Sequence, residues 1–416
     1  MKTAGILFLA ALIAALAVAT ATGQMHSPQR WEYSTIAQNI LQGRGAVYDY
    51  FGTEYHFYGP ALYPFLLAAV LKISGQREAA VLILQAVIYA LTCALIYQIA
   101  QPLFGQPAAV LAFLLALFHP GNLIYAGKLH PQTLDVFFIV LSFLLLMRLG
   151  TMLSPAKAFG AGCVAGLAAL CRGTIAPLFL LWTLWFLWKE RNRPARAWGV
   201  ATGLALGMAL IFSPIILHGY RLYGTLIPLR TDTGMNLWYG NHPGASGTSY
   251  TLGSHPVPVT SELPAGLLAK LGNANEVGQN WLLTEASMQF IRENPAEAAR
   301  LFIRKTFYFW WFSPHTGLLY PQRWLNAYKV YYTLVLFLAV WGLVEAFRSA
   351  RPGSRKAAIL FLLIAGSVSV SQSLFYVEGR HRWQIEPLLL LFTAVGAARL
   401  LQLLNPGPTL LLEAAE

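Results

Sequence analysis

The chain has 416 residues, of which 56% are hydrophobic and only 11% are charged, and its net charge is +12. Soluble domains carry about 25% charged residues, so this composition excludes an ordinary water-soluble protein. The excess of Lys and Arg lies in short clusters between apolar runs, which is typical of membrane topology and not of nucleic-acid binding.

The cysteines give no indication of a disulfide framework or a structural metal. There are three, Cys93, Cys163 and Cys171, and all lie in apolar segments. An odd number in such segments argues against disulfides, and no CxxC or Cys/His cluster is present. We therefore expect neither a metal nor another cofactor.

The first apolar run, residues 5–22, has two interpretations. It follows Lys2 and ends in Ala-Thr-Ala, which fits a cleavable signal peptide or a first transmembrane helix. Because further apolar runs follow along the chain, we favour an uncleaved helix.

The apolar runs predict an all-α, polytopic membrane protein. A helix needs about 20 residues to cross the hydrocarbon core, and its backbone groups must bond within the segment. We expect one membrane-embedded domain over residues 1–416, without a separate soluble C-terminal domain. The pair 158–171 and 174–188 is short, and a re-entrant hairpin would preserve the even number of spans. The ten predicted spans are 5–22, 79–100, 107–124, 133–149, 158–171, 174–188, 198–217, 328–347, 357–376 and 383–403.

Charge asymmetry predicts the orientation. With the N-terminus in the cytoplasm, three basic clusters lie in short cytoplasmic loops, as the positive-inside rule requires. These clusters are Arg148 with Lys157; Lys189, Arg191, Arg193 and Arg196; and Arg348, Arg351, Arg355 and Lys356. Two long polar segments, about 23–78 and 218–327, then face outward.

Both outer segments are expected to carry amphipathic helices on the membrane surface. In the first, Ser27 and Pro28 predict a helix start, and Gly43 predicts its end. Residues 60–73 predict a second surface helix. In the second segment, a helix capped by Asn294 is predicted to start at Pro295 and to reach the aromatic cluster 307–311.

Acids are scarce, with 17 Asp plus Glu, and most fall on the outer side. Glu32 follows the first span and can accept a proton from a hydroxyl, or it is a solvated charge on the polar face of a surface helix. Arg380 and Arg382 lie in a short charged segment between two spans and can bind a phosphate, or they snorkel to the interface. Arg172 either binds the same phosphate or forms an ion pair with a nearby acid.

Residues 233–244 form an expected loop that is rich in amide and aromatic groups. Asn236, Trp238 and Asn241 offer groups suited to a sugar, although the same residues fit an ordered turn. His56 is a weaker candidate, because the histidines show no metal spacing. Arg230 is one of several outer basic residues that run against the positive-inside bias, and an anionic ligand or lipid headgroups would explain them.

These motifs together resemble the membrane glycosyltransferases that use lipid-linked sugars. The likeness is to glycosyltransferase family 39, the dolichyl-phosphate-mannose protein mannosyltransferases and aminoarabinose transferases, and it extends from about Glu32 to Pro387. The segments that carry it are Trp31–Gly43, Gly59–Pro64, Ala169–Arg172, Trp238–Asn241, Ile291–Pro295 and Arg380–Arg382.

The resemblance implies transfer of a sugar from a polyprenyl phosphate to a hydroxyl of a lipid, glycan or protein, by inverting displacement at the outer face of the cytoplasmic membrane. It implies an acidic base in the first outer loop, basic residues on the donor phosphate and no required metal. Relatives usually carry an Asp where Gln29 stands here, so the base is Glu32, or alternatively Glu54 or Asp49. The expected donor-phosphate residues are Arg380, Arg382 and Arg172, and the expected substrate-binding residues are Tyr33, His56, Asn236, Trp238, Asn241 and His381.

Two other functions fit parts of the pattern. A polymerase or ligase of lipid-linked glycans would transfer a chain instead of one sugar. A transporter or flippase would require inverted repeats and charges near the membrane midplane, which the spans nearly lack.

Overall fold

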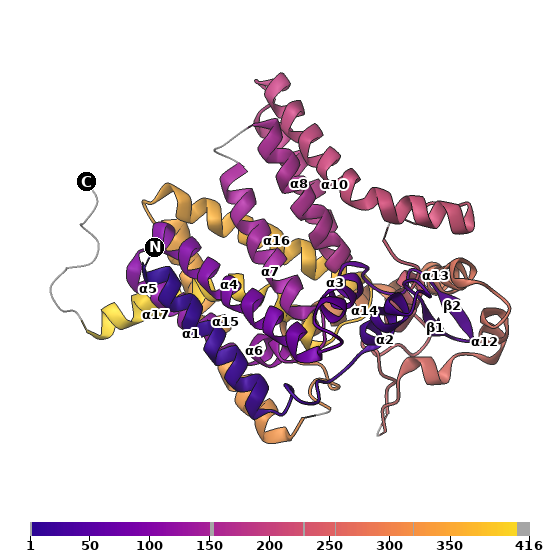
Figure 1. The fold of residues 1–416 in the computed structure, drawn as a ribbon. Helices are drawn as coiled ribbons and strands as arrows, with labels where there is room; N and C mark the ends of the chain where they lie inside the picture. The colour runs from indigo at the N-terminus through magenta and orange to yellow at the C-terminus, as the bar shows by residue number, and fades with distance from the viewer. Residues whose placement is uncertain (1, 150–153, 228, 254, 319, 406–416) are drawn as a thin grey trace.

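The computed structural model describes residues 2–149, 154–227, 229–253, 255–318 and 320–405, and these residues are mainly α-helical (Figure 1). The long helices are α1 (Lys2–Ala21), α4 (Glu78–Phe104), α7 (Gln132–Leu149), α8 (Pro155–Cys171), α9 (Ala176–Lys189), α10 (Pro194–Tyr223), α15 (Gln322–Arg348), α16 (Pro352–Leu374) and α17 (Glu386–Leu404). Between α4 and α7 lie α5 (Gln106–Leu117) and α6 (Pro120–Ala126).

Six helices, α1, α4, α10, α15, α16 and α17, are long and apolar enough to cross a membrane. The pair α5 and α6 adds a seventh candidate, bent by 55° at the break. Each of the ten predicted spans coincides with a helix or a bent helix pair, which confirms a polytopic helical membrane protein. The count of ten stays a prediction, because α7, α8 and α9 are not among these candidates, and α8 and α9 have only 17 and 14 residues.

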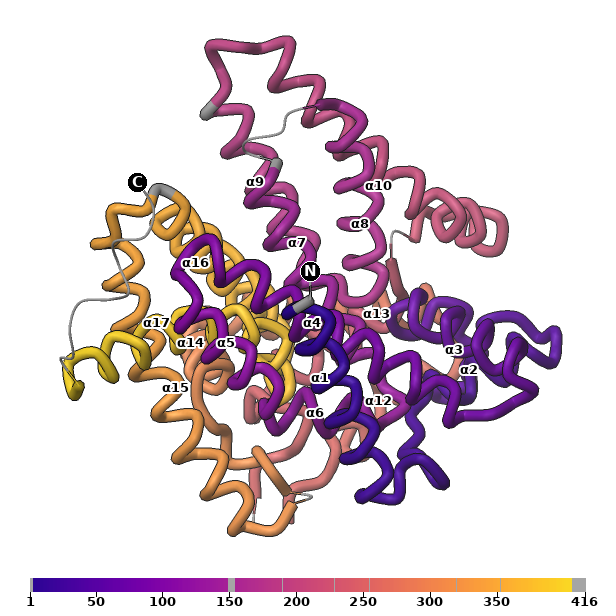
Figure 2. The backbone as a smooth tube through the Cα atoms, turned by 60° about the vertical axis from the view of Figure 1, so that its left-hand side comes forward, coloured from indigo at the N-terminus to yellow at the C-terminus, as the bar shows by residue number. Residues whose placement is uncertain are grey.

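Close glycine contacts hold α8 against α10 and α15 against α17. A Cβ on Gly207 of α10 would overlap the Phe159 carbonyl oxygen, and one on Gly342 of α15 would overlap the Phe392 carbonyl oxygen. Small residues at such crossings let helix backbones approach within a membrane. Figure 2 shows α8, α9 and α10 projecting beyond the rest of the bundle, while α1 lies along α4.

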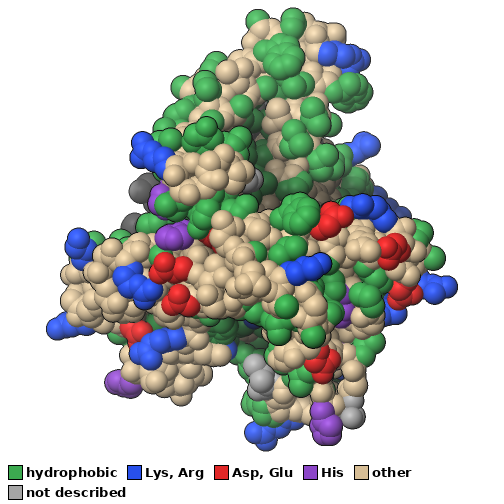
Figure 3. Space-filling view, turned by 90° about the vertical axis from the view of Figure 1, so that its right-hand side faces the viewer, with side chains coloured by type: hydrophobic (Ala, Val, Ile, Leu, Met, Phe, Trp, Pro, Cys, Tyr) green, Lys and Arg blue, Asp and Glu red, His purple; other side chains and the backbone are tan. Residues whose placement is uncertain are grey.

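The two predicted outer segments lie together at one end of the molecule (Figure 1). The first contains α2 (Glu32–Leu41), the antiparallel hairpin of β1 (Tyr48–Tyr50) and β2 (Thr53–Tyr55), and α3 (Leu62–Ile73). The second contains α11 (Thr233–Gly240), η2 (Val259–Glu262), α12 (Ala265–Leu271), α13 (Glu276–Glu293) and α14 (Pro295–Trp310). Charged side chains are frequent on this end, whereas the projecting helices show mostly apolar ones (Figure 3).

Buried polar contacts join the two outer segments. The carboxylate of Glu276, at the start of α13, is fully buried and accepts the backbone N–H groups of His56 at 3.0 Å and Phe57 at 3.2 Å. The Tyr55 hydroxyl donates to the Gln279 side-chain oxygen at 2.5 Å. Because an unpaired buried carboxylate is costly, these bonds fix the first segment onto α13.

The first surface helix begins later than expected. Ser27 and Pro28 do not start it; α2 begins at Glu32, because Gln29 pairs through its carbonyl with the Leu129 backbone N–H at 3.1 Å. Asn39 of α2 is buried and donates to the Val47 carbonyl at 2.8 Å. The expected surface helices α3 and α14 are present, although the Asn294 side chain does not cap α14.

Candidate active site

The charged segment before α17 folds as the short helix η3 (Gly379–Gln384), and its two arginines point into different surroundings. Arg380 is partly exposed and pairs with Glu378 at 2.9 Å. Glu378 also accepts a hydrogen bond from the Ser249 hydroxyl at 2.7 Å. Arg382 is 1% exposed. Only Arg380 therefore has open access to a ligand from this segment.

Arg382 belongs to a buried network inside the helical bundle. Its Nε donates to Glu386 Oε1 at 2.5 Å, and its guanidinium carbon lies 3.6 Å from the centroid of the Tyr332 ring. The other Glu386 oxygen contacts His119, which lies at the break between α5 and α6. Tyr328 of α15 donates to both Glu386 oxygens at 3.2 Å. These contacts tie four helices together around one compensated charge pair.

Arg172 is also held by an acid. Its Nε lies 2.5 Å from a carboxylate oxygen of Asp135 in the first turn of α7, and both side chains are largely buried. The ion pair that the sequence left open as an alternative for Arg172 is therefore the observed arrangement.

Glu32, the first residue of α2, is partly buried and forms no ion pair within the described residues. Burial raises its pKa, while its own backbone N–H and the nearby Arg380 act in the opposite direction. Arg230 and Asp232 are also close enough to influence this carboxyl group. Within the described residues, Glu32 is thus a carboxylate that is not held in an ion pair and whose pKa burial shifts toward neutral pH, the direction that favours a general base.

Arg230 and Asp232 form a bidentate ion pair just before α11. The sequence counted Arg230 among the outer basic residues that suggest an anionic ligand, but it gave no reason to place this residue beside Glu32. Arg230 comes near Glu32 because the second outer segment packs against the first.

Lys128, between α6 and α7, is a cation that the sequence analysis did not single out. Its Nζ donates to the Tyr320 hydroxyl at 3.1 Å and lies 4.9 Å from the Tyr125 ring centroid and 5.7 Å from that of Trp31. Burial lowers its pKa, and the like charge of Arg380 adds to that effect. No acid lies within ion-pair distance of Lys128 in the described residues.

Two of the sequence motifs meet at Tyr33. Its buried ring packs edge-on against Tyr63 at 5.6 Å between ring centroids. Gly59 adopts a positive φ of 68°, and a Cβ there would lie 3.3 Å from the Tyr33 ring. Tyr33 therefore packs the first outer loop together and supports the adjacent Glu32.

The alternative acids lie on the β hairpin. Glu54 pairs with Arg44 at 2.9 Å, and its side chain is 48% exposed. Asp49 lies 3.9 Å from the same arginine and is more exposed. Neither acid shares the partly buried surroundings of Glu32.

The expected sugar-binding loop is not a loop, because residues 233–240 form α11. Trp238 and Asn241 are buried, and the Asn241 amide bonds the Leu374 carbonyl at 2.8 Å. Asn236 donates to the Asp232 carbonyl at 3.0 Å, so it supports the residue beside Arg230. Gly234 allows close packing of α11 on α13, because a Cβ there would overlap the Asn280 carbonyl oxygen.

The two candidate histidines also have local roles. His381 is buried, and its Nδ1 accepts the Glu378 backbone N–H at 3.1 Å. His56 contributes its backbone N–H to Glu276, and its ring lies 6.4 Å from the ring of His218. Within the described part of the chain, no group of three or more His, Cys, Asp or Glu residues could hold a metal ion.

Comparison with known families gives an independent result. Residues 59–218 match the family of dolichyl-phosphate-mannose-protein mannosyltransferases. The match covers less than half of the chain and confirms the resemblance that the motifs indicated. It includes Gly59 and Arg172 and excludes Glu32 and Arg380. A sequence comparison with curated proteins finds no match.

Solved structures share the fold. The oligosaccharyltransferase AglB of Archaeoglobus fulgidus, in complex with an inhibitory peptide and a dolichol-phosphate, has 15% identity and a TM-score of 0.50 over 96% of this chain and 51% of that chain. The oligosaccharyltransferase of Archaeoglobus fulgidus tethered to an acceptor peptide has 14% identity and a TM-score of 0.53 over 96% of this chain and 50% of that chain.

The chain thus spans about half the length of these oligosaccharyltransferases. ArnT from Cupriavidus metallidurans, bound to undecaprenyl phosphate, aligns at 15% identity over 95% of this chain and 78% of that chain. Its TM-score of 0.38 is too low to establish a shared fold.

Proposed function

We propose that this protein is a glycosyltransferase that moves a sugar from a polyprenyl-phosphate donor to a hydroxyl acceptor, with inversion, at the outer face of the cytoplasmic membrane. The observation that carries the proposal is Glu32, a partly buried carboxylate that forms no ion pair within the described residues and that feels the charges of Arg380, Asp232 and Arg230. The family match over residues 59–218 supports a lipid-linked donor.

In this reaction, Glu32 accepts the proton of the acceptor hydroxyl as that oxygen attacks the anomeric carbon. The bond between the anomeric carbon and the phosphate oxygen breaks, and the prenyl phosphate leaves with the electron pair. Arg380 and Arg230 stabilise the charge that develops on the phosphate. Because both arginines are already paired, with Glu378 and Asp232, they are oriented before the donor arrives.

We assign Arg382 and Arg172 to the support of this site, because both are held in buried ion pairs with Glu386 and Asp135. These ion pairs compensate the arginine charges and so explain how charged side chains can be buried next to membrane-spanning helices. Tyr33 supports Glu32 from the same helix. Glu54 remains the alternative base, and its exposed pair with Arg44 makes it the natural comparison.

The test uses purified full-length protein in nanodiscs with a panel of short-chain prenyl-phosphate sugars and acceptor extracts. Release of prenyl phosphate is measured for wild type, Glu32→Gln and Glu54→Gln. We expect release by wild type, a loss of about 100-fold or more in Glu32→Gln, and near-normal release in Glu54→Gln.

A loss of release in Glu54→Gln, with near-normal release in Glu32→Gln, would instead identify Glu54 on the β hairpin as the base. No release with any donor would overturn the proposed function. Product length separates transfer of one sugar from ligation of a glycan chain.

A further inference from the structure

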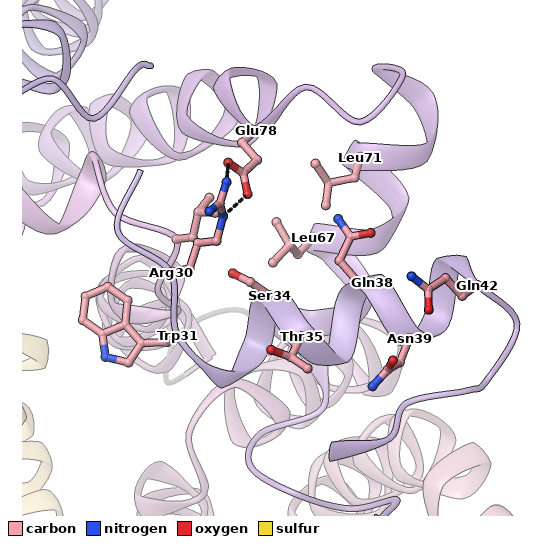
Figure 4. Close-up of a pocket in the computed structure, with 11 residues that line it drawn as sticks. Arg30, Trp31, Ser34, Thr35, Gln38, Asn39, Gln42, Leu67, Leu71 and Glu78 are labelled. Atoms are coloured by element: carbon pink, nitrogen blue, oxygen red, sulfur yellow. Dashed lines mark hydrogen bonds and ion pairs between the residues drawn. The ribbon is translucent and has the colours of Figure 1, made fainter. Parts of the chain in front are cut away.

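A groove of about 660 Å³ lies between α2, α3 and the start of α4 (Figure 4). Its volume falls within the roughly 300–1,000 Å³ that is usual for small-molecule sites. We propose that this groove binds the saccharide part of the acceptor, which makes the acceptor a glycan; this inference rests on the proposed function.

The residues that line the groove carry no net charge, which argues against an anionic ligand. Arg30 and Glu78 form a bidentate ion pair at 2.7 and 2.8 Å across its upper end (Figure 4). Arg30 is the only cation among the lining residues, and Glu78 compensates its charge. The pair therefore fits an uncharged ligand better.

The lining offers hydroxyl and amide groups that suit a polyhydroxyl ligand. Within the part of the chain that the structure describes, the buried hydroxyl of Ser34 has no hydrogen-bond partner, and Thr35 is exposed at the rim. One helical turn further, Gln38 holds only a 3.3 Å contact to Gln76, and Gln42 lies after the helix end. Hydroxyl and amide groups both donate and accept, which matches the hydroxyl groups of a sugar.

Leu67 and Leu71 of α3 lie beneath the groove but are only 0% and 2% exposed. The apolar surface open to a ligand therefore comes mainly from the partly buried Trp31, at the end next to Glu32. An indole combines an apolar face with one N–H donor, so it can cover the C–H face of a pyranose. The Trp31 ring also contacts the ring of His130 at 5.0 Å between centroids. A glycan that lies along α2 would therefore bring a hydroxyl to the start of this helix, where Glu32 lies.

The experiment measures binding of a panel of neutral oligosaccharides to the full-length protein in nanodiscs by calorimetry, without donor. The variants are Gln38→Ala combined with Gln42→Ala, and Thr35→Trp, which fills the rim. Gln289→Ala is the matched control, because Gln289 is an exposed helical amide in α13, outside the groove lining. We expect at least one oligosaccharide to bind wild type, and the groove variants to raise its Kd roughly tenfold.

Measurements of turnover distinguish a failure of the saccharide site from a failure of the proposed function. In the groove variants, KM for a glycan acceptor should rise while kcat is retained, whereas Glu32→Gln should keep oligosaccharide binding and lose turnover. Oligosaccharide binding without any transferase activity would keep the saccharide site and reject the proposed function. Unchanged binding in both groove variants, or no oligosaccharide binding at all, would overturn the saccharide site.

Discussion

At the scale of single residues, neighbouring charges of the same type have different surroundings. Arg380 and Arg382 are two positions apart, yet one is partly exposed beside Glu378 and the other is buried against Glu386 and an aromatic ring. A partly exposed pair contributes little to stability, whereas a broken buried pair leaves an uncompensated charge.

Substitution of the two arginines should therefore affect different properties of the protein, stability for Arg382 and turnover for Arg380. Arg382→Ala should destabilise the protein by roughly 3–5 kcal/mol, because Glu386 would remain buried without its guanidinium partner. Arg380→Ala should leave the melting temperature nearly unchanged and reduce turnover. Thermal unfolding in detergent and prenyl-phosphate release, measured on both variants, check this prediction. Equal losses of stability would contradict the assigned roles.

The pH dependence of activity should report Glu32. A general base must be ionised, and an ordinary Glu has a pKa of about 4.3. Because burial raises the pKa of Glu32, kcat/KM should fall with decreasing pH at a higher pH than for an ordinary Glu. Arg380 lowers this pKa, so Arg380→Gln should move the acid limb to still higher pH. Arg300→Gln, an exposed arginine of α14, is the control and should leave the limb in place.

Lys305 of α14 should make stability depend on pH. It is 1% exposed, and burial lowers its pKa to about 7. The unfolded chain keeps a lysine protonated up to roughly pH 10. Between these values the unfolded state binds more protons, so the free energy of unfolding rises with pH.

The measurement is the melting temperature between pH 7 and roughly pH 10. The rise of the melting temperature with pH should be weaker in Lys305→Met. It should be unchanged in Lys270→Met, because Lys270 is an exposed lysine at the end of α12. Lys305→Met should also lose the hydrogen bonds to the Gly240 carbonyl at 3.1 Å and the Asn241 side chain at 3.0 Å. An identical pH profile in Lys305→Met would exclude this lysine as the source of the rise.

At the scale of elements, glycines determine how closely the helices pack. Gly207→Ala should destabilise the protein by roughly 1–3 kcal/mol, because the added methyl group would meet the backbone of α8. Gly160→Ala in α8 is the matched control, since a Cβ there meets nothing within 4 Å. The control should be neutral or stabilising by about 0.5–1 kcal/mol, because alanine favours helix. Melting temperatures of the two variants in detergent test the contact, and equal values would argue against it.

At this scale the sequence predicted the helices but not how they associate. Apolar length and proline or glycine positions are local signals, and they located α3, α14 and the spans within a few residues. The start of α2 was wrong, because Gln29 bonds to the distant Leu129 backbone. The residues expected as a sugar-binding loop form α11 because they pack on α13, which no local pattern reveals.

At the scale of the whole molecule, the basic clusters and the proposed active site lie at opposite ends of the helices. Gln42 follows α2 in the outer segment, and Arg193 lies in the loop before α10. In intact cells, a membrane-impermeant maleimide should label Gln42→Cys and spare Arg193→Cys. The wild-type chain gives the background, because Cys93 and Cys171 are buried and Cys163 is half-buried. Labelling of Arg193→Cys alone would reverse the proposed orientation.

The sequence by itself identified a membrane protein and most of its long helices, and its basic clusters predict the orientation in the membrane. Those properties follow from composition, segment length and charge along short stretches of chain. The tertiary structure decided which charges are open to a ligand. Arg172 meets Asp135, Lys128 meets Trp31 and Tyr320, and Glu276 meets the backbone at His56, each across a long separation in sequence. Burial and pairing depend on such distant contacts, so the residues around Glu32 could be recognised only in the folded chain.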